Sequence, residues 1–122
     1  MKADPKTVLV VDDELEIAEA VRSILEDEGF RVLTAADGQE ALAVLAEQQP
    51  NLILLDMLMP RVSGLELIRR LDEARSHQDA TVILMSAVSP PAKQPNSRWK
   101  AFLQKPFSID DLIGAVRRFS PA

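Results

Sequence analysis

The stretch TVLVVDDE, residues 7–14, decides the fold class, because a run of aliphatic and β-branched residues ends there in acidic side chains. A near-continuous apolar run is typical of a strand that other elements cover on both faces. Three more runs end in polar groups in the same way: NLILLD at 51–56, TVILMS at 81–86 and AFLQKP at 101–106. In an open parallel sheet, the carboxyl ends of the strands meet in one crevice. We therefore expect these polar groups to lie together.

Segments of helical period separate the apolar runs, which is the pattern of repeated βα units around a parallel sheet. The sequence predicts an α/β domain whose strands cover residues 7–11, 30–35, 51–55, 81–85 and 101–103. The last predicted helix begins after Ser108, where the S-x-x-D pattern with Asp111 forms a capping box. We expect residues 1–122 to form one domain, because the chain has the length of a single hydrophobic core.

Residues 88–100 interrupt this alternation of strands and helices, at the place where the pattern calls for another helix. Pro90, Pro91 and Pro95 each remove a backbone donor and push the preceding residue towards extended geometry. We therefore expect this fourth helix to be short, irregular or absent.

Composition excludes several classes of function. A chain without cysteine has no disulfide and no thiolate metal site. A net charge of -5 disfavours direct binding to nucleic acid, because such binding depends on neutralising phosphates. The apolar runs are far shorter than a membrane helix requires, and the N-terminus lacks the apolar region of a signal peptide. We expect a cytoplasmic protein, monomeric or weakly dimeric, whose partners are proteins and not membranes.

The acidic residues at the strand ends predict a metal site. Asp12, Asp13 and Asp56 would repel one another at close quarters unless a cation lay among them. Carboxylate oxygens together with water suit Mg²⁺, with Mn²⁺ as the alternative. Ser86 and Lys105 would add a hydroxyl group and an ammonium group to the same crevice.

Four motifs in order, VLVVDDE, LLDMLMPRVSG, VILMSA and FLQKPF, closely resemble the receiver domain of two-component response regulators. The resemblance covers nearly the whole chain. It implies a single receiver domain with a flavodoxin-like, doubly wound sheet of five parallel strands in the order 2-1-3-4-5. It also implies that Asp56 accepts a phosphoryl group from a histidine kinase or a histidine phosphotransfer protein, and that phosphorylation switches a face that binds a downstream protein.

The resemblance also implies the ligands of the metal ion. Asp13, Asp56 and the backbone carbonyl of Leu58 would coordinate Mg²⁺ directly, and Asp12 would act mainly through water. Phosphoryl transfer depends mostly on positioning and on neutralising charge, so a cation and a lysine would do the main work.

Further residues receive roles by the same resemblance. Lys105 would pair with the phosphoryl oxygens, and the bond between Lys105 and Pro106 would be cis. Ser86 would bind a phosphoryl oxygen, and Phe102 would move inward as the switch residue. Phenylalanine lacks a phenolic group that could report the outer state, so only packing could drive this movement. The alternative for Phe102 is a plain core position. Leu58 and Val88 would flank the phosphoryl group, and their aliphatic side chains predict slow self-dephosphorylation.

Two other classes of protein compete with a phosphoacceptor. A binding-only pseudoreceiver would use the proline-rich residues 89–100 as a scaffold, and one hypothesis makes Arg98, Trp99 and Lys100 a partner-docking loop. The alternative places Trp99 against the core. A phosphatase with a carboxylate nucleophile would need a second acid two residues after Asp56, where Leu58 stands. We therefore expect no enzyme beyond self-catalysed phosphorylation and dephosphorylation.

Overall fold

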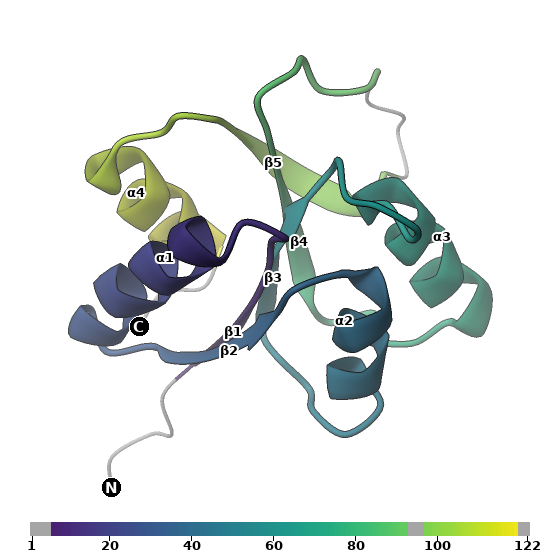
Figure 1. Cartoon of the computed structure of the whole chain (residues 1–122). Helices are drawn as coiled ribbons and strands as arrows, with labels where there is room; N and C mark the ends of the chain where they lie inside the picture. Colours follow the sequence, from purple (N-terminus) through teal and green to yellow (C-terminus); the bar gives the residue numbers. More distant parts are fainter. Residues whose placement is uncertain (1–5, 93–96, 120–122) are drawn as a thin grey trace, which may run out of the picture.

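The computed structural model describes residues 6–92 and 97–119 and shows a five-stranded parallel sheet (Figure 1). The strands run in the order β2-β1-β3-β4-β5, which confirms the predicted order 2-1-3-4-5. Their bounds are β1 Thr7–Val11, β2 Arg31–Ala35, β3 Leu52–Asp56, β4 Thr81–Ser86 and β5 Trp99–Gln104. Every pair of neighbouring strands is parallel, so all five carboxyl ends lie at one edge of the sheet.

Four helices of the described residues cover the two faces of the sheet. Their bounds are α1 Leu15–Asp27, α2 Gly38–Leu45, α3 Gly64–Ala74 and α4 Ile109–Phe119. Helices α1 and α4 lie on one face, and α2 and α3 lie on the other (Figure 1). Among the described residues, no helix is both long enough and apolar enough to cross a bilayer.

The central strands are apolar throughout because both of their faces are buried. In β1, Val8 and Val10 pack in the core layer under α1 and α4, whereas Leu9 and Val11 pack in the layer under α2 and α3. All five residues of β3 are buried. Successive side chains of a strand point to opposite faces, so a strand that is covered twice has no polar positions until it ends. The polar side chains that could form a functional site therefore lie at the carboxyl ends of these strands.

The connection between β4 and β5 contains no helix in its described residues 87–92 and 97–98. Pro90 and Pro91 lie in this part without a helix, as predicted, and Pro95 lies outside the described residues. The helix labelled α4 follows β5 and begins at the predicted capping box. There the Ser108 hydroxyl accepts a bond from the Asp111 N–H at 2.9 Å, and the Ser108 N–H donates to the Asp111 carboxylate at 3.4 Å.

The hypothesis of a partner-docking loop centred on Trp99 is wrong, because Trp99 is part of β5 and belongs to the core. Its exposure is 9%, and it packs in the layer under α2 and α3. The register between β4 and β5 shifts between Val82 and Ile83: Val82 pairs with Trp99 and Ile83 pairs with Ala101, and Lys100 lies between these two partners. At this irregularity Trp99 is buried and Lys100 is exposed.

Arg98 is also held in place, and not presented to a partner. Its guanidinium donates to the Asp72 carboxylate at 2.8 Å and to the main-chain carbonyls of Ser76 and His77, just beyond the end of α3. A cation at the C-terminal end of a helix interacts favourably with the helix dipole. The start of β5 is therefore anchored to the end of α3.

Candidate functional site

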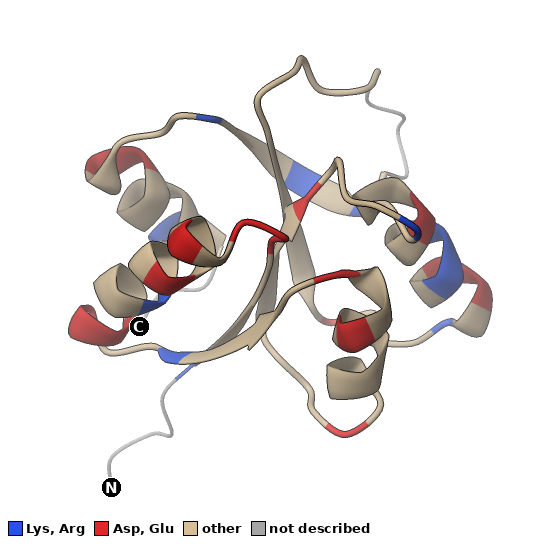
Figure 2. Ribbon diagram, viewed as in Figure 1, with Lys and Arg blue, Asp and Glu red and all other residues tan. Residues whose placement is uncertain are grey.

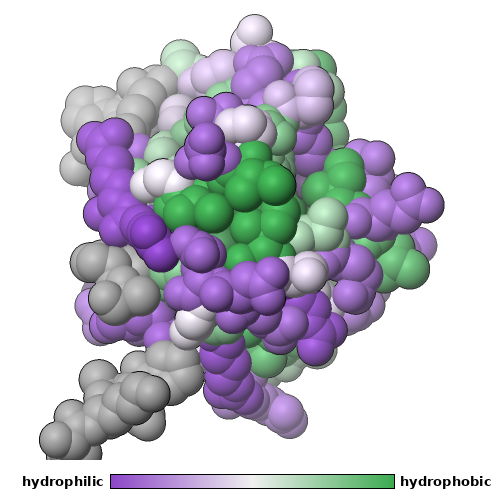
Figure 3. Space-filling view, turned by 90° about the vertical axis from the view of Figure 1, so that its left-hand side faces the viewer, coloured by the Kyte–Doolittle hydropathy of each residue, from purple (hydrophilic) through white to green (hydrophobic). Residues whose placement is uncertain are grey.

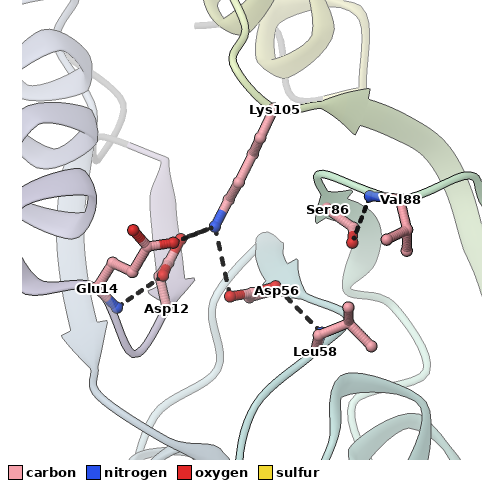
Figure 4. A network of polar contacts seen from close by, with 7 residues as sticks. All are labelled: Asp12, Glu14, Asp56, Leu58, Ser86, Val88 and Lys105. Atoms are coloured by element: carbon pink, nitrogen blue, oxygen red, sulfur yellow. Dashed lines mark hydrogen bonds and ion pairs between the residues drawn. The ribbon is translucent and has the colours of Figure 1, made fainter.

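Four polar side chains from distant parts of the chain meet at the carboxyl edge of the sheet (Figure 4). Asp12 follows β1, Asp56 ends β3, Ser86 ends β4 and Lys105 follows β5. Asp12, Asp56 and Ser86 are 1%, 4% and 1% exposed, and they are the only buried polar residues in the described part of the chain. The predicted convergence of these side chains is confirmed.

The same kind of local hydrogen bond orients each of the three buried side chains. Asp12, Asp56 and Ser86 each accept a hydrogen bond from the backbone N–H of the residue two positions later. The donors and distances are Glu14 at 2.9 Å, Leu58 at 3.1 Å and Val88 at 3.2 Å. Short Asp and Ser side chains form such turns readily. The backbone just after each of these three strands therefore holds one oxygen of the functional side chain at the strand end.

Lys105 supplies the positive charge that the buried carboxylates need. Its Nζ donates to Asp12 Oδ2 at 2.8 Å and to Asp56 Oδ2 at 3.4 Å, and it lies 3.5 Å from Glu14 Oε1. Burial alone lowers the pKa of the Lys105 ammonium, but the hydrogen bonds and charges of Asp12 and Asp56 raise it overall above its ordinary value. Lys105 is therefore a permanent cation in this crevice.

Burial raises the pKa of Asp56 to about 6, against the opposing effects of the Leu58 N–H bond and the Lys105 charge. The negative charge of Asp12 adds to the rise. Asp56 is thus mostly ionised at neutral pH and protonated in mild acid. An ionised carboxylate can act as a metal ligand or as a nucleophile.

The donor set fits a divalent cation that prefers oxygen. Asp12, Asp13 and Asp56 each offer one carboxylate oxygen within 4.8 Å of the others. Figure 2 shows acidic residues gathered in the connection between β1 and α1, which borders this edge of the sheet. Three carboxylates and no nitrogen or sulfur ligand are typical of a Mg²⁺ or Mn²⁺ site. The division of ligands between Asp12, Asp13 and the carbonyl of Leu58 remains a prediction.

The other sequence-predicted residues lie close to this centre or on β5. The peptide bond between Lys105 and Pro106 is cis, as the resemblance implied. Phe102 is partly buried and packs against the core layer under α2 and α3. Its role as a switch, like that of Ser86, remains a prediction.

Sequence reasoning missed the part that Gly64 plays beside Asp56. A Cβ atom at Gly64 would lie 2.4 Å from the carbonyl oxygen of Asp56 and 3.0 Å from the Cα of Met57. The Gly64 N–H donates to the Met57 carbonyl at 3.1 Å. Only glycine permits so close an approach of α3 to the backbone that carries Asp56. Nothing in the sequence showed which backbone would lie opposite this glycine.

Comparison with known proteins agrees with this geometry. A family model described as the response regulator receiver domain matches residues 8–117. The chain belongs to this family.

Solved receiver domains share the fold closely. The response regulator TrrA from Thermotoga maritima, crystallised in complex with Mg²⁺ and BeF, is 34% identical over 93% of this chain and 98% of its own, with a TM-score of 0.81. A CheY-like receiver domain protein from Methanospirillum hungatei is 28% identical over 93% of both chains, with a TM-score of 0.85.

Curated relatives differ in length. Protein PilG from Pseudomonas aeruginosa is 31% identical, and the alignment covers 99% of this chain and 92% of PilG. Response regulator MprA from Mycolicibacterium vanbaalenii is 34% identical over 93% of this chain but only 49% of MprA. The receiver domain therefore spans about half the length of MprA and almost all of PilG.

The raised pKa of Asp56 predicts a pH-dependent stability of the metal-free protein. Because the folded-state value of about 6 exceeds the ordinary 3.8, this group stabilises the fold fully below pH 3.8 and loses that contribution as pH rises through 6. In EDTA at pH 7, Asp56→Asn should therefore raise the free energy of unfolding by on the order of 1–3 kcal/mol. Urea unfolding between pH 3.5 and 7.5 measures this difference.

The exposed Asp79 offers a matched control, because Asp79→Asn removes the same charge from a solvated position. The Asp79→Asn curve should follow that of the wild type. A gain in Asp56→Asn that is equally large at pH 3.5 and pH 7 would show that ionisation of Asp56 is not its cause.

Proposed function

We propose that Asp56 accepts a phosphoryl group from a phosphohistidine of a histidine kinase or a histidine phosphotransfer protein, in a reaction that requires Mg²⁺. One observation carries this proposal: a carboxylate with 4% exposure directs one oxygen at an ammonium group, and a buried hydroxyl ends the neighbouring strand. The Mg²⁺ and BeF bound to TrrA, a relative of the same fold, support the same chemistry.

The transfer step needs a nucleophile and charge neutralisation. One carboxylate oxygen of Asp56 forms a bond to phosphorus while the P–N bond breaks, and the imidazole, protonated on its other nitrogen, leaves with the electron pair of that bond. Negative charge spreads over the equatorial oxygens, where the Lys105 ammonium can neutralise part of it. Asp12 and Asp13 would help to hold Mg²⁺, which supplies further positive charge beside these oxygens.

Ser86 is placed to bind the transferred group. Its Oγ accepts the Val88 N–H bond at 3.2 Å, and the hydroxyl proton is free to point at a phosphoryl oxygen. Recruiting Ser86 would pull on Val88 and on the connection between β4 and β5. We propose that this movement, with repacking of Phe102, changes a face that a downstream protein reads.

The phosphodonor protein needs a surface beside Asp56. A groove of about 460 Å³ lies between α1 and the turn from β5 to α4, and both Glu14 and Lys105 line it together with apolar side chains. Figure 3 shows that the face of α1 and α4 carries apolar surface ringed by hydrophilic residues. We propose that the phosphodonor protein covers this groove when it brings its phosphohistidine to Asp56.

We further propose that residues 1–122 form one receiver domain that is monomeric or weakly dimeric, cytoplasmic and directed at proteins and not nucleic acid. The pseudoreceiver alternative gains no support, because the acids and Lys105 are assembled and Trp99 is buried.

The direct test is incubation with acetyl phosphate and Mg²⁺, read by intact mass. Wild type should gain the mass of one phosphoryl group, and Asp56→Asn should gain none, because the amide is not a nucleophile. EDTA should abolish the gain. A wild-type mass that stays unchanged, or an equal gain in Asp56→Asn, would contradict the proposal.

The phosphorylated protein should lose its phosphoryl group slowly. Leu58 and Val88 are 55% and 47% exposed beside Asp56 and Ser86, and neither side chain can orient an attacking water. Leu58→Asn should therefore shorten the phosphoryl half-life several-fold, which intact mass after removal of acetyl phosphate would follow. Leu65 is an exposed leucine on α3, and the same change there, Leu65→Asn, should leave the half-life unchanged. If the phosphoryl half-life of Leu58→Asn were as long as that of the wild type, the aliphatic side chain of Leu58 would not be a cause of slow dephosphorylation.

A further inference from the structure

Asp12 and Asp56 present their oxygens in the same way. In each carboxylate, Oδ1 accepts the backbone N–H of the residue two positions later, at 2.9 Å for Asp12 and 3.1 Å for Asp56. In each, Oδ2 accepts from Lys105 Nζ, at 2.8 Å and 3.4 Å. The ammonium therefore contacts, in each carboxylate, the oxygen that does not accept the backbone N–H.

A divalent cation in the cluster of Asp12, Asp13 and Asp56 would compete with the ammonium for these carboxylates, at Asp56 directly and at Asp12 directly or through a bound water. Mg²⁺ binds carboxylate oxygens at about 2.0–2.1 Å, so an ion on Asp56 would lie close to Lys105 Nζ in its present position. Two positive charges at such a distance in a poorly solvated crevice repel strongly. Lys105 must then give up at least part of its contact with Asp12 and Asp56 whenever the cation binds.

Glu14 is placed to receive the displaced ammonium. Of the three acidic partners of Lys105 among the described residues, Asp12 and Asp56 belong to the metal site, and Glu14 is the third. Its Oε1 lies 3.5 Å from Nζ, and its side chain is 62% exposed at the start of α1 (Figure 4). A small movement of Lys105 towards Glu14 would keep the ammonium paired and still close to Asp56.

We propose that Glu14 is a positioning residue that takes over the Lys105 ammonium when a divalent cation binds the cluster of Asp12, Asp13 and Asp56. The inference rests on the proposed metal-dependent function and adds a coupling between Glu14 and Lys105 to it. Glu14 thus strengthens metal binding through Lys105, beyond the weak attraction that any nearby acid exerts on a cation. It also keeps the lysine at the place where phosphoryl oxygens arrive.

A double-mutant cycle on Mg²⁺ affinity tests the coupling. Isothermal titration calorimetry would compare wild type, Glu14→Gln, Lys105→Gln and the double variant, each checked for folding by its thermal unfolding curve. We expect Glu14→Gln to weaken Mg²⁺ binding about three- to tenfold when Lys105 is present. In the Lys105→Gln background the same change should cost less than about twofold, because no displaced ammonium remains to be paired.

Glu16→Gln is the matched control. Glu16 is exposed in the first turn of α1 and lines the same groove, and the change removes the same charge. It should weaken Mg²⁺ binding by less than about twofold in both backgrounds. Glu14→Asp, which keeps a carboxylate at this position, should recover part of the affinity lost in Glu14→Gln.

Two results would overturn the inference: a loss in Glu14→Gln no larger than that in Glu16→Gln, or an equal loss with and without Lys105. Either would mean that Glu14 acts only through its general charge. If wild type failed to bind Mg²⁺ at all, the proposed metal-dependent function would fail and the coupling with it. A Mg²⁺ response in wild type without coupling would instead leave the proposed function intact.

Discussion

The contact of one ammonium group with two buried carboxylates is the interaction on which the site depends. Lys105 lies 2.8 Å from Asp12 and 3.4 Å from Asp56, and the three residues come from segments that only the parallel sheet brings together. Buried charges are costly unless they are paired, so this contact permits two acids to remain buried at the carboxyl ends of β1 and β3. Replacing that pairing with a metal ion and a phosphoryl group is the basis of the proposed function.

The backbone prepares the site for this exchange. Each strand that carries a functional side chain continues into a turn whose N–H group binds that side chain, so Asp12, Asp56 and Ser86 are oriented before any ligand arrives. Burial raises the pKa of Asp56 to about 6, which leaves its carboxylate ionised at neutral pH but poorly solvated. A preorganised and poorly solvated anion next to a cation favours charge neutralisation during phosphoryl transfer. The same features make the site responsive to the charge that a phosphoryl group adds.

The sequence predicted the sheet and the main site residues because both arise from local patterns. Apolar runs such as TVLVV and NLILL show strands buried on two faces, and parallel pairing places the residues after Val11 and Leu55 at one edge. The sequence left the position of Trp99 open between a docking loop and the core, because no local pattern shows that β5 begins at this residue or that its register with β4 shifts there. Glu14 and Gly64 were missed as parts of the site because their neighbours, Lys105 and the Asp56 carbonyl, are set by tertiary packing.

The most direct test uses the backbone amide NMR signals of Glu14, Leu58 and Val88, whose N–H groups bind the three buried site residues. Addition of Mg²⁺ with beryllofluoride, a phosphoryl mimic, should shift all three signals in the wild-type protein, because Asp12, Asp56 and Ser86 would each gain a new partner. Asp56→Asn should suppress the shifts at Leu58 and Val88. Signals that stay in place in wild type, or that move equally in Asp56→Asn, would contradict a phosphoryl site built on Asp56.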